Sequence, residues 1–592
     1  MTTEQIRHLK PLWFGDELSL LGHLHLPRGT AYDIAVVICA TPFGYENIAG
    51  HRGLRILADE LAASGIASLR FDFPGTGDSD GIQSVDSWRQ SVSSAVARLK
   101  RETGCRQLGV IGVGLGGTIA ITCLDAGLDI DKLVVWEPHL SGREWLRKHR
   151  AYHRLAAGAE YASSSPSPSA AATEELSGFP MTAELAKGLT ALDVTKYETG
   201  LWPESRSRPA ALLVARDLEK TGGRHRDVLS IRGIAALGES WDGLDQMYVE
   251  PHLSIAPKPL FARMRSWLLE GVGERSSFVV GQQVDESTST RIGANGMVEE
   301  IARYTEGDGG LLFSMETRPM GRQPDPTWLV MLTGRAVRHI GPNRIWVRMA
   351  RELAERGYAS VRLDGRSVGD SDGSGNGLMP NEEYYQEHIY DDIEQIMEVA
   401  RVNGAQRFLM TGICSGATAS YQIAWRRNDV AAILLLNPLQ LRHDPEDDER
   451  AKIQLAKKVR FRTERLREPG FYLQILKGEY SFRKPLKVIR TRFAALFHRG
   501  KVMLDERSYV YRGFHDLAAK PVEIDVFVSN DDPICISFLE RHFGIDFKGL
   551  PGDRIRVHRC PDADHTIRPL RAQEMFAGVL REALARISGR SV

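Results

Sequence analysis

The sequence predicts an α/β fold with two tandem domains, each containing a mostly parallel, doubly wound sheet covered by helices. The chain has 592 residues, several times the usual domain length of about 100 to 150 residues, so at least two domains are expected. Segments 57–81 and 349–373 align without a gap and share 14 of 25 residues. Apolar strand-like runs alternate with amphipathic segments through both copies, which favours a parallel sheet.

The repeat contains the same three elements in both copies. An amphipathic helix ends at Gly65 or Gly357, a short strand follows, and a Gly-Asp-Ser-Asp-Gly turn closes the segment. Glycine and aspartate suit turn geometry, so we expect both turns to be structural. The spacing of the repeat, 349 − 57 = 292 residues, is far too long for a solenoid, so each copy is predicted to be a complete domain.

The domain boundaries follow from composition. The run SWLLEGV at 266–272 is typical of a closing helix, and residues 303–319 predict a hairpin that resembles the start of the chain. The polar, glycine-containing residues between them indicate a linker. The sequence therefore predicts a first domain over 1–275, a linker over 276–300 and a second domain over 301–592.

Composition excludes several classes of protein. Lys plus Arg and Asp plus Glu both number 76, so no overall field favours nucleic acid. The N-terminus has no uninterrupted apolar segment and no run of 18 apolar residues occurs, so we expect a soluble cytoplasmic protein. Six cysteines without C-x-x-C spacing argue against a zinc site or a disulfide framework, and no metal or cofactor is expected. The sequence leaves the oligomeric state open.

Two glycine-rich turns follow apolar runs at equivalent places in the copies. Residues 412–416 read G-I-C-S-G, the pattern of a nucleophile elbow with Cys414 where serine is usual. The first copy has the same kind of turn with Gly114 in the central place. The next apolar strand ends at Pro138 in one copy and at Pro438 in the other, 300 residues apart. One copy therefore offers a thiol nucleophile, whereas the other has no side chain to acylate.

With these features each copy resembles an α/β-hydrolase-fold domain, similar to the serine-aminopeptidase-like and exosortase-system-associated-like hydrolases. The resemblance covers nearly the whole chain, twice. The Gly-Asp-Ser-Asp-Gly turns, the elbows and the order nucleophile, acid, histidine carry it. It implies a helical lid inserted in each domain. It does not supply a substrate.

The second copy has the residues of a triad in the order of that family. Cys414 is followed by Asp532, at the end of an apolar strand, and by His565 in a later loop. A thiol is only a few per cent thiolate at neutral pH, so an imidazole must take its proton and a carboxylate must fix the imidazole tautomer. The adjacent Asp531 is an alternative for the acid. The backbone of Ser415 and of Gly334 or Arg335 is predicted to form the oxyanion hole.

The first copy is predicted to be a degenerate site. Asp217 and His252 stand where the acid and base belong, 35 residues apart, against 33 for Asp532 and His565. Since Gly114 replaces the nucleophile, we expect this copy to serve as a scaffold, a docking surface or part of the active-site wall.

A basic lid is predicted at about 440–515 of the second copy. From Arg450 to Lys501 there are 16 Lys or Arg and three Glu, an excess of 16 − 3 = 13 positive charges. One interpretation is a solvated face; the other is a docking surface for an acidic carrier protein, for coenzyme A phosphates or for an anionic membrane. The docking candidates are Lys457, Lys458, Arg465 and Arg467.

A cysteine nucleophile bears on the reaction. An acyl-enzyme at Cys414 is a thioester, close in energy to an acyl-carrier or coenzyme A donor, and it can acylate an alcohol or amine if water is excluded. The sequence therefore favours an acyl-transfer enzyme. The alternatives are a thioesterase or carboxylesterase with the same triad, and a non-catalytic tandem module that binds a ligand or partner.

Overall fold

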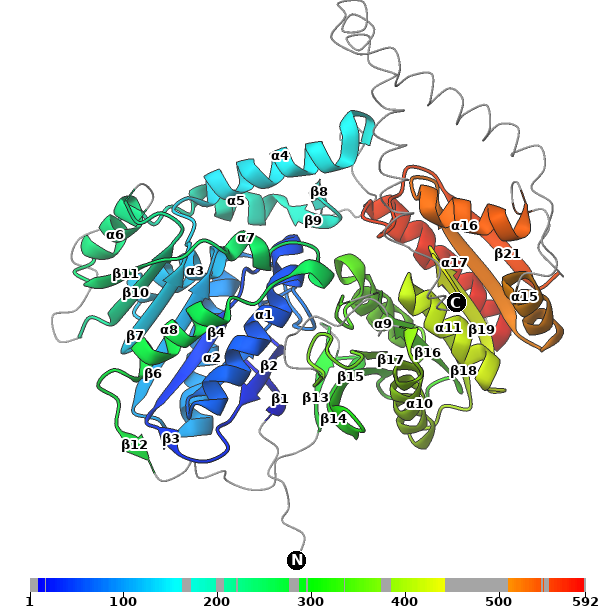
Figure 1. Cartoon of the computed structure of the whole chain (residues 1–592), viewed down its shortest axis with the longest axis horizontal. Helices are drawn as coiled ribbons and strands as arrows, with labels where there is room; N and C mark the ends of the chain where they lie inside the picture. The colour runs from blue at the N-terminus through cyan, green and yellow to red at the C-terminus, as the bar shows by residue number, and fades with distance from the viewer. Residues whose placement is uncertain are drawn as a thin grey trace, which may run out of the picture.

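A computed structural model shows the two sheets that the repeat predicts (Figure 1). It describes residues 9–15, 18–161, 172–197, 207–219, 222–275, 287–293, 296–334, 336–373, 385–441, 509–544, 547 and 553–589. The first sheet has the order β1-β2-β5-β4-β6-β7-β10-β11, and the second has the order β13-β14-β15-β17-β16-β18-β19-β20-β21. The predicted α/β class with two tandem sheets is therefore confirmed.

The first sheet begins with antiparallel pairs and is parallel from β5 onwards. Its strands are β1 (Leu9–Phe14), β2 (Leu20–His25), β5 (Ala67–Phe71), β4 (Ile34–Cys39), β6 (Gln107–Val113), β7 (Lys132–Trp136), β10 (Ala210–Ala215) and β11 (Ala236–Ser240). The central strands are fully buried because helices cover both faces. These helices are α1 (Gly44–Ala63), α2 (Val85–Thr103), α3 (Leu115–Asp125), α6 (Gly222–Ser230), α7 (Leu244–Met247) and α8 (Lys258–Leu269).

The second sheet repeats this plan with one further antiparallel strand at its edge. Its strands are β13 (Ser287–Ile292), β14 (Val298–Gly307), β15 (Gly310–Pro319), β17 (Ser360–Leu363), β16 (Thr327–Leu332), β18 (Arg407–Ile413), β19 (Val430–Leu436), β20 (Glu523–Ser529) and β21 (Ile555–Cys560). Its helices are α9 (Ile345–Glu355), α10 (Glu387–Val402), α11 (Ser415–Arg426), α15 (Tyr509–Ala519), α16 (Pro533–Phe543) and α17 (Leu570–Ser588).

The segment predicted to be a linker, 276–300, contains part of the second sheet. Strand β13 lies within it and pairs antiparallel with β14, which begins at Val298. The polar, glycine-containing composition indicates a linker, but the β-branched threonines of β13 also suit an edge strand. The short strands β12 (Glu274–Arg275) and β3 (Ala31–Tyr32) pair within the first copy.

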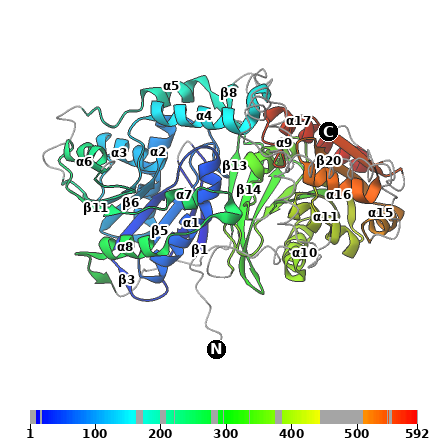
Figure 2. The same cartoon turned by 45° about the horizontal axis from the view of Figure 1, so that its top comes forward.

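The first copy carries an insertion between β7 and β10. It consists of α4 (Gly142–Tyr161), the hairpin β8 (Ala172–Leu176) and β9 (Phe179–Thr182), and α5 (Ala183–Ala191). This insertion reaches across to α17 of the second copy in both views (Figures 1 and 2). Most of the predicted basic lid at 440–515, with all four docking candidates, lies outside the described residues.

The two copies pack through equivalent surfaces, related by the 292-residue offset. Arg70 Nη2 donates to Asp370 Oδ1 over 2.7 Å, and Arg362 Nη1 donates to Asp78 Oδ1 over 2.5 Å. Both arginines and both aspartates are buried. A second pair of equivalent arginines also makes matching contacts. Arg52 and Arg344 each donate to two carbonyls of the Gly-Asp-Ser-Asp-Gly turn in the opposite copy. The interface therefore has an internal pseudo-two-fold symmetry.

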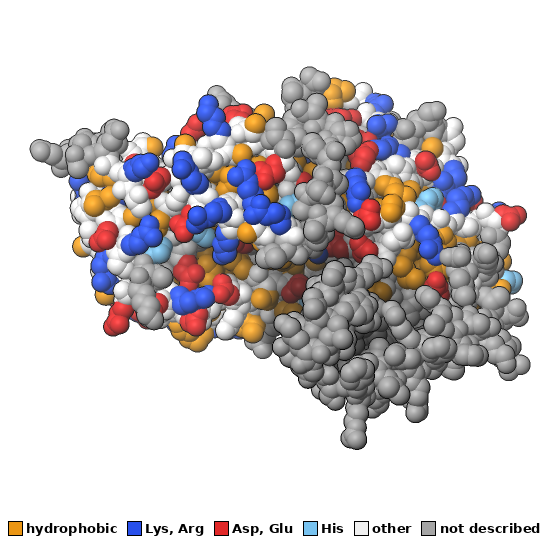
Figure 3. All heavy atoms as spheres, turned by 90° about the horizontal axis from the view of Figure 1, so that it is seen from above, with side chains coloured by type: hydrophobic (Ala, Val, Ile, Leu, Met, Phe, Trp, Pro, Cys, Tyr) orange, Lys and Arg blue, Asp and Glu red, His pale blue; other side chains and the backbone are white. Residues whose placement is uncertain are grey.

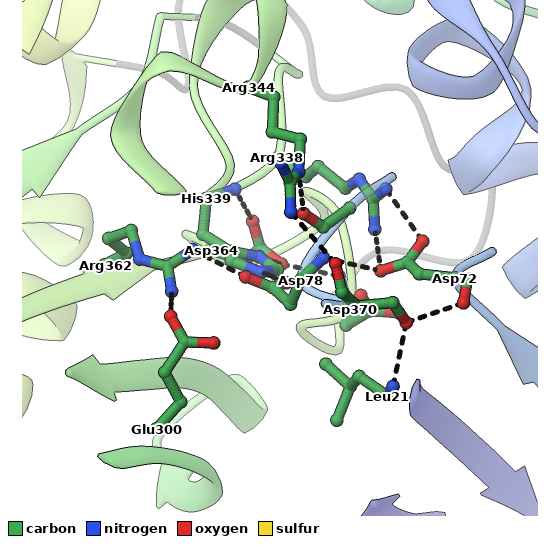
Figure 4. Close-up of polar contacts among 12 residues, drawn as sticks. Leu21, Asp72, Asp78, Glu300, Arg338, His339, Arg344, Arg362, Asp364 and Asp370 are labelled. Carbon is green, nitrogen blue, oxygen red and sulfur yellow. Dashed lines mark hydrogen bonds and ion pairs between the residues drawn. The ribbon is translucent and has the colours of Figure 1, made fainter. Parts of the chain in front are cut away.

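The Gly-Asp-Ser-Asp-Gly turns thus lie at the centre of this interface, beyond the local turn role predicted for them (Figure 4). His339 of the second copy joins them, with Nδ1 2.9 Å from Asp364 and Nε2 2.5 Å from Asp78. Burial lowers the pKa of His339, but the two carboxylates outweigh it and raise the pKa to about 10. Because the buried charges are paired, they tolerate removal from water.

Candidate active site

Cys414 lies at the sharp turn between β18 and α11. It adopts φ 56° and ψ −116°, and its amide donates to the Leu436 carbonyl over 3.1 Å. A non-glycine residue at positive φ is strained, and such strain is typical of functional sites. The turn needs the flanking glycines, since a Cβ on Gly412 would lie 2.3 Å from Gly416 and one on Gly416 would lie 2.7 Å from the Thr333 carbonyl. The Cys414 side chain is partly exposed.

The structure brings Asp532 and His565 together behind this turn. Asp532 Oδ2 lies 2.5 Å from His565 Nδ1. Its Oδ1 accepts hydrogen bonds from the amides of Ile534 and Cys535, at 3.2 and 3.1 Å, because Asp532 is the N-cap of α16. The carboxylate is 4% exposed and so is held in one orientation. Asp532, one of the two candidate acids, thus contacts His565 directly.

His565 is held in its charged form. Burial lowers its pKa, but the hydrogen bonds with Asp532 and with the Cys414 side chain outweigh burial and raise the pKa to about 10. The ring is 33% exposed, so it remains accessible from solvent. A group that can carry a proton therefore lies beside Cys414.

Asn437 is a site residue that sequence reasoning missed. It is fully buried directly after β19. Its Nδ2 donates to the His565 carbonyl over 2.7 Å and to Ser529 Oγ over 2.9 Å, and its Oδ1 accepts from the Ser529 amide over 2.8 Å. Asn437 therefore joins the histidine loop to the strand that leads to Asp532. The aligned position in the first copy is Glu137, and this difference between the copies was the available signal.

The predicted oxyanion donors are only partly described. Ser415 begins α11, where the first backbone N–H groups of a helix have no intrahelical acceptor. Gly334 lies beside Cys414, since a Cβ added to it would be 3.0 Å from Cys414 Cβ. Arg335 lies outside the described residues. A mainly apolar pocket of about 50 Å³ borders this loop and the start of α11. Its lining includes Leu332, Leu363, Val368, Ile389, Ile393 and Ala419.

The elbow of the first copy, at Gly114, has nearly the same backbone conformation as the elbow at Cys414 but different neighbouring side chains. Gly114 adopts φ 56° and ψ −125°, and its amide donates to the Trp136 carbonyl over 2.9 Å. The three atoms nearest to a Cβ placed there are Thr41 Oγ1 at 2.9 Å, Tyr248 Oη at 3.6 Å and His139 Nε2 at 3.8 Å. The hydroxyls of Tyr248 and Thr41 lie 3.1 Å apart. Side chains of the first copy therefore crowd the place of the missing nucleophile.

The two residues predicted to be relics, Asp217 and His252, come from two other segments of the first copy. Asp217 follows β10, and its Oδ1 accepts a hydrogen bond from the Glu219 amide over 3.1 Å. His252 lies on a short 3₁₀ helix, Pro251–Leu253. Neither residue supplies one of the three atoms nearest to the Gly114 Cβ position.

One group of described residues has the composition of a metal site. His339, Asp364 and Asp370 place three potential ligand atoms within 4.8 Å of one another. Both nitrogens of His339 already contact carboxylates, and Asp370 pairs with Arg70, so this group belongs to the interface between the copies. In the described part of the chain, no helix is both long and apolar enough to cross a membrane.

No family model matches the chain, and no curated protein matches it. Among solved structures it is similar to an α/β serine hydrolase homologue from Coxiella burnetii, with 15% identity, a TM-score of 0.29, and coverage of 47% of this chain and 96% of that chain. An esterase from Pyrococcus furiosus has 16% identity, a TM-score of 0.32, and coverage of 45% and 91%. A proline iminopeptidase from Mycobacterium smegmatis has 17% identity, a TM-score of 0.30, and coverage of 48% and 98%.

Similarity at this level says nothing about the reaction. The architecture of the chain itself gives the fold of each copy: a mostly parallel sheet, helices on both faces, and an elbow between the strand and the helix at its centre. Both copies have the α/β-hydrolase fold.

Proposed function

We propose that the second copy is an acyl-transfer enzyme that forms an acyl-enzyme at Cys414, with His565 as the proton carrier and Asp532 as the residue that orients it. The observation that supports this most strongly is the 2.5 Å contact between Asp532 and His565 behind a thiol at a strained elbow. The first copy has no nucleophile at the equivalent place, so one reaction centre is expected in the chain.

The first half of the reaction transfers the acyl group to the enzyme. Cys414 Sγ attacks the carbonyl carbon of a thioester or activated ester, and the carbonyl oxygen becomes an oxyanion beside the start of α11. The bond to the leaving group breaks, and the leaving thiolate or alkoxide takes the proton from His565. Once Cys414 is acylated, its negative charge no longer raises the pKa of His565, so the ring can give up this proton.

The second half releases the product. The neutral His565 ring accepts a proton from an alcohol or amine while the acceptor atom attacks the acyl carbon. The bond between carbon and Sγ breaks and restores the Cys414 thiolate beside a protonated His565. The net reaction exchanges the thiol of the donor for the acceptor, with no oxidant or reductant consumed.

The donor class in this proposal is anionic, either an acyl carrier protein or coenzyme A. Helix α4 carries three exposed cations, Arg143, Arg147 and Lys148. Lysine and arginine side chains are also spread over the face seen in Figure 3. Attraction between such charges and a donor is screened beyond about 8 Å at physiological ionic strength. Acylation of Cys414 by an anionic donor is therefore expected to slow severalfold at high salt, while acylation by a small neutral thioester hardly changes.

Replacement of the docking candidates tests the same point without salt. Glutamine at Lys457 with Lys458, or at Arg465 with Arg467, should slow acylation by the anionic donor alone. If neither salt nor these variants discriminate between donors, a carrier-linked substrate is wrong.

A second candidate function is hydrolysis by the same residues. The His565 ring is 33% exposed, so water can reach the group that would activate it. A thioesterase or carboxylesterase would result if water outcompetes the acceptor at the acyl-enzyme.

One experiment separates these candidates. The protein and its Cys414→Ala variant are incubated with an acyl thioester, with and without alcohol or amine acceptors, and analysed by intact mass and product chromatography. Transfer predicts an acyl adduct on the parent protein and an acceptor-dependent ester or amide. Free acid as the main product in every reaction would indicate hydrolysis, and the absence of both adduct and turnover would indicate a binding module.

A further inference from the structure

The hairpin of the first copy, β8 and β9, lies against the start of α17 in the second copy (Figures 1 and 2). Gln573, which is 1% exposed, donates from Nε2 to the Gly178 carbonyl at the hairpin turn over 3.0 Å. The same nitrogen donates to the Arg568 carbonyl over 2.7 Å. Glu175 of the hairpin accepts from the Leu570 amide over 3.3 Å, at the N-terminus of α17. The hairpin therefore contacts the end of the loop that begins at His565.

The approach of the hairpin turn is close enough to require glycine. Gly178 adopts φ 93°, and a Cβ on it would lie 2.6 Å from the Arg568 carbonyl and 2.9 Å from Asn343. Gly178 thus meets two conditions at once, a left-handed backbone and contact with another backbone.

The loop that receives these contacts is strained. Ile567, two residues after His565, is fully buried and adopts φ 47°. A β-branched residue in this conformation persists only where its surroundings hold it. Within the loop, Asp564 accepts from the Arg568 amide over 2.9 Å. Asn437 holds the His565 carbonyl at one end, and Gln573 ties the other end to the hairpin.

We propose that the hairpin of the first copy is a positioning element for the active site of the second: through Gly178 and Glu175 it fixes the loop that places His565 against Cys414. The copy without a nucleophile would then complete the site of the copy that has one. This inference rests on the proposed role of His565.

The variants that test it lie on both sides of the contact. Gly178→Ala pushes a methyl group against the Arg568 carbonyl, and Gln573→Leu leaves the Gly178 and Arg568 carbonyls without this donor. Glu174→Gln is the matched control, because Glu174 is the neighbouring hairpin residue and pairs with Arg150 of the first copy at 2.7 Å. All variants are first shown to be folded by their thermal unfolding curves.

The readout is the rate of Cys414 alkylation by iodoacetamide as a function of pH, followed by peptide mapping. In the parent and in Glu174→Gln, fast alkylation is expected to persist to neutral pH and below. In Gly178→Ala and Gln573→Leu, the rate at pH 7 should fall by about tenfold and the profile should move towards that of an ordinary thiol, which titrates near about 8.5. Loss of stability alone would not move this profile in folded protein.

The outcomes are distinguishable. If the folded Gln573→Leu variant keeps the parent profile, the hairpin does not position His565 and the inference is wrong, while the proposed function stands. If Cys414 of the parent reacts no faster than the buried thiols, the proposed function itself is wrong. If Gly178→Ala does not fold, Gln573→Leu decides alone.

Discussion

The elbows at Cys414 and Gly114 share a backbone conformation and differ in the side chains nearest to the turn. Their φ angles are both 56°, their ψ angles are −116° and −125°, and each amide donates to the last residue of the neighbouring strand. In the second copy His565, which Asp532 contacts, lies beside Cys414. In the first copy Thr41, Tyr248 and His139 lie nearest to the equivalent place. The two copies therefore share the backbone of the turn, while the side chains around it differ.

The comparison also explains why a copy without a nucleophile remains in the chain. The copies bury equivalent ion pairs against each other, Arg70 with Asp370 and Arg362 with Asp78. Removal of the first copy would expose or orphan the partners of these charges in the second. The copy without a nucleophile at its elbow can therefore be needed for the stability of the copy that carries Cys414.

The largest effect is expected at the nucleophile. Cys414→Ala should abolish acyl-enzyme formation, and Cys414→Ser should lower turnover by about a thousandfold or more, because the site is matched to a thiolate. Turnover and intact mass with an acyl thioester are the measurements. Cys105→Ala, a buried thiol of the first copy, is the control and should change turnover little. Full activity in Cys414→Ala would remove the distinction between the copies.

The interface between the copies allows a test of whether Arg70 and Arg362 contribute equally to stability. Arg362→Met and Arg70→Met should each lower the free energy of unfolding by about 3–5 kcal/mol, since each leaves a buried aspartate without its guanidinium. Denaturant unfolding measures both. Arg98→Gln, which breaks a partly exposed pair with Glu102 on α2, should cost less than about 1 kcal/mol. A large effect of one interface arginine and none of the other would contradict the pseudo-two-fold symmetry.

His339 makes the interface sensitive to alkaline pH. Its pKa is raised from about 6.5 to about 10, so its contribution to stability is fully present below about pH 6.5 and is lost as pH rises through about 10. The free energy of unfolding between pH 7 and 10.5 should therefore fall in the parent. His339→Asn, which installs the residue found at the aligned Asn47, should start lower and fall less steeply. Parallel curves for the two proteins would show that His339 is not the titrating group.

Asn437 and Glu137 occupy aligned positions in the two copies, so substitutions at these positions serve as test and control for the effect on turnover. Asn437→Asp keeps the shape of the side chain but replaces the donor to the His565 carbonyl by an acceptor. We expect turnover to fall by about tenfold to a hundredfold with a smaller change in KM, since the nucleophile remains and its proton carrier is displaced. Glu137→Gln in the first copy should leave turnover within about threefold. Equal effects of the two substitutions would mean that Asn437 acts only through stability.

The smallest effects are expected at the degenerate site. Asp217→Ala and His252→Ala should leave the rate of the chemical step within about threefold, below about 1 kcal/mol in barrier. Gly114→Ser should create no second reaction centre, because its Cβ would be 2.9 Å from Thr41 Oγ1. Single-turnover rates and adduct mapping test these variants. A hundredfold loss, or an adduct at position 114, would show that the first copy performs chemistry.

The sequence predicted the two sheets and the elbows because each rests on local patterns. The triad of Cys414, Asp532 and His565 stays a prediction. It left Asp531 and Asp532 open because the residues are adjacent, and the choice depends on which carboxylate caps α16 and faces His565. Asn437 escaped notice because its partners, Ser529 and His565, are distant in the sequence.

The interface could not be predicted from the repeat. Asp78 and Asp370 stand in identical turns, and a turn role accounts for both without a partner. Their arginines come from the opposite copy, so the pairing depends on how two complete domains pack. The strand β13 was missed for a different reason, since a polar edge strand lacks the apolar alternation by which strands are found.

The central claim is that one copy reacts while the other supports it. The most direct test is to incubate the unmodified protein with an acyl thioester, digest it under conditions that preserve thioesters, and map the acyl group by mass spectrometry. We predict a single labelled site, at Cys414, with a stoichiometry approaching one acyl group per chain and no label in the peptide that contains Gly114. Label at another residue, or equal labelling of several cysteines, would contradict the account.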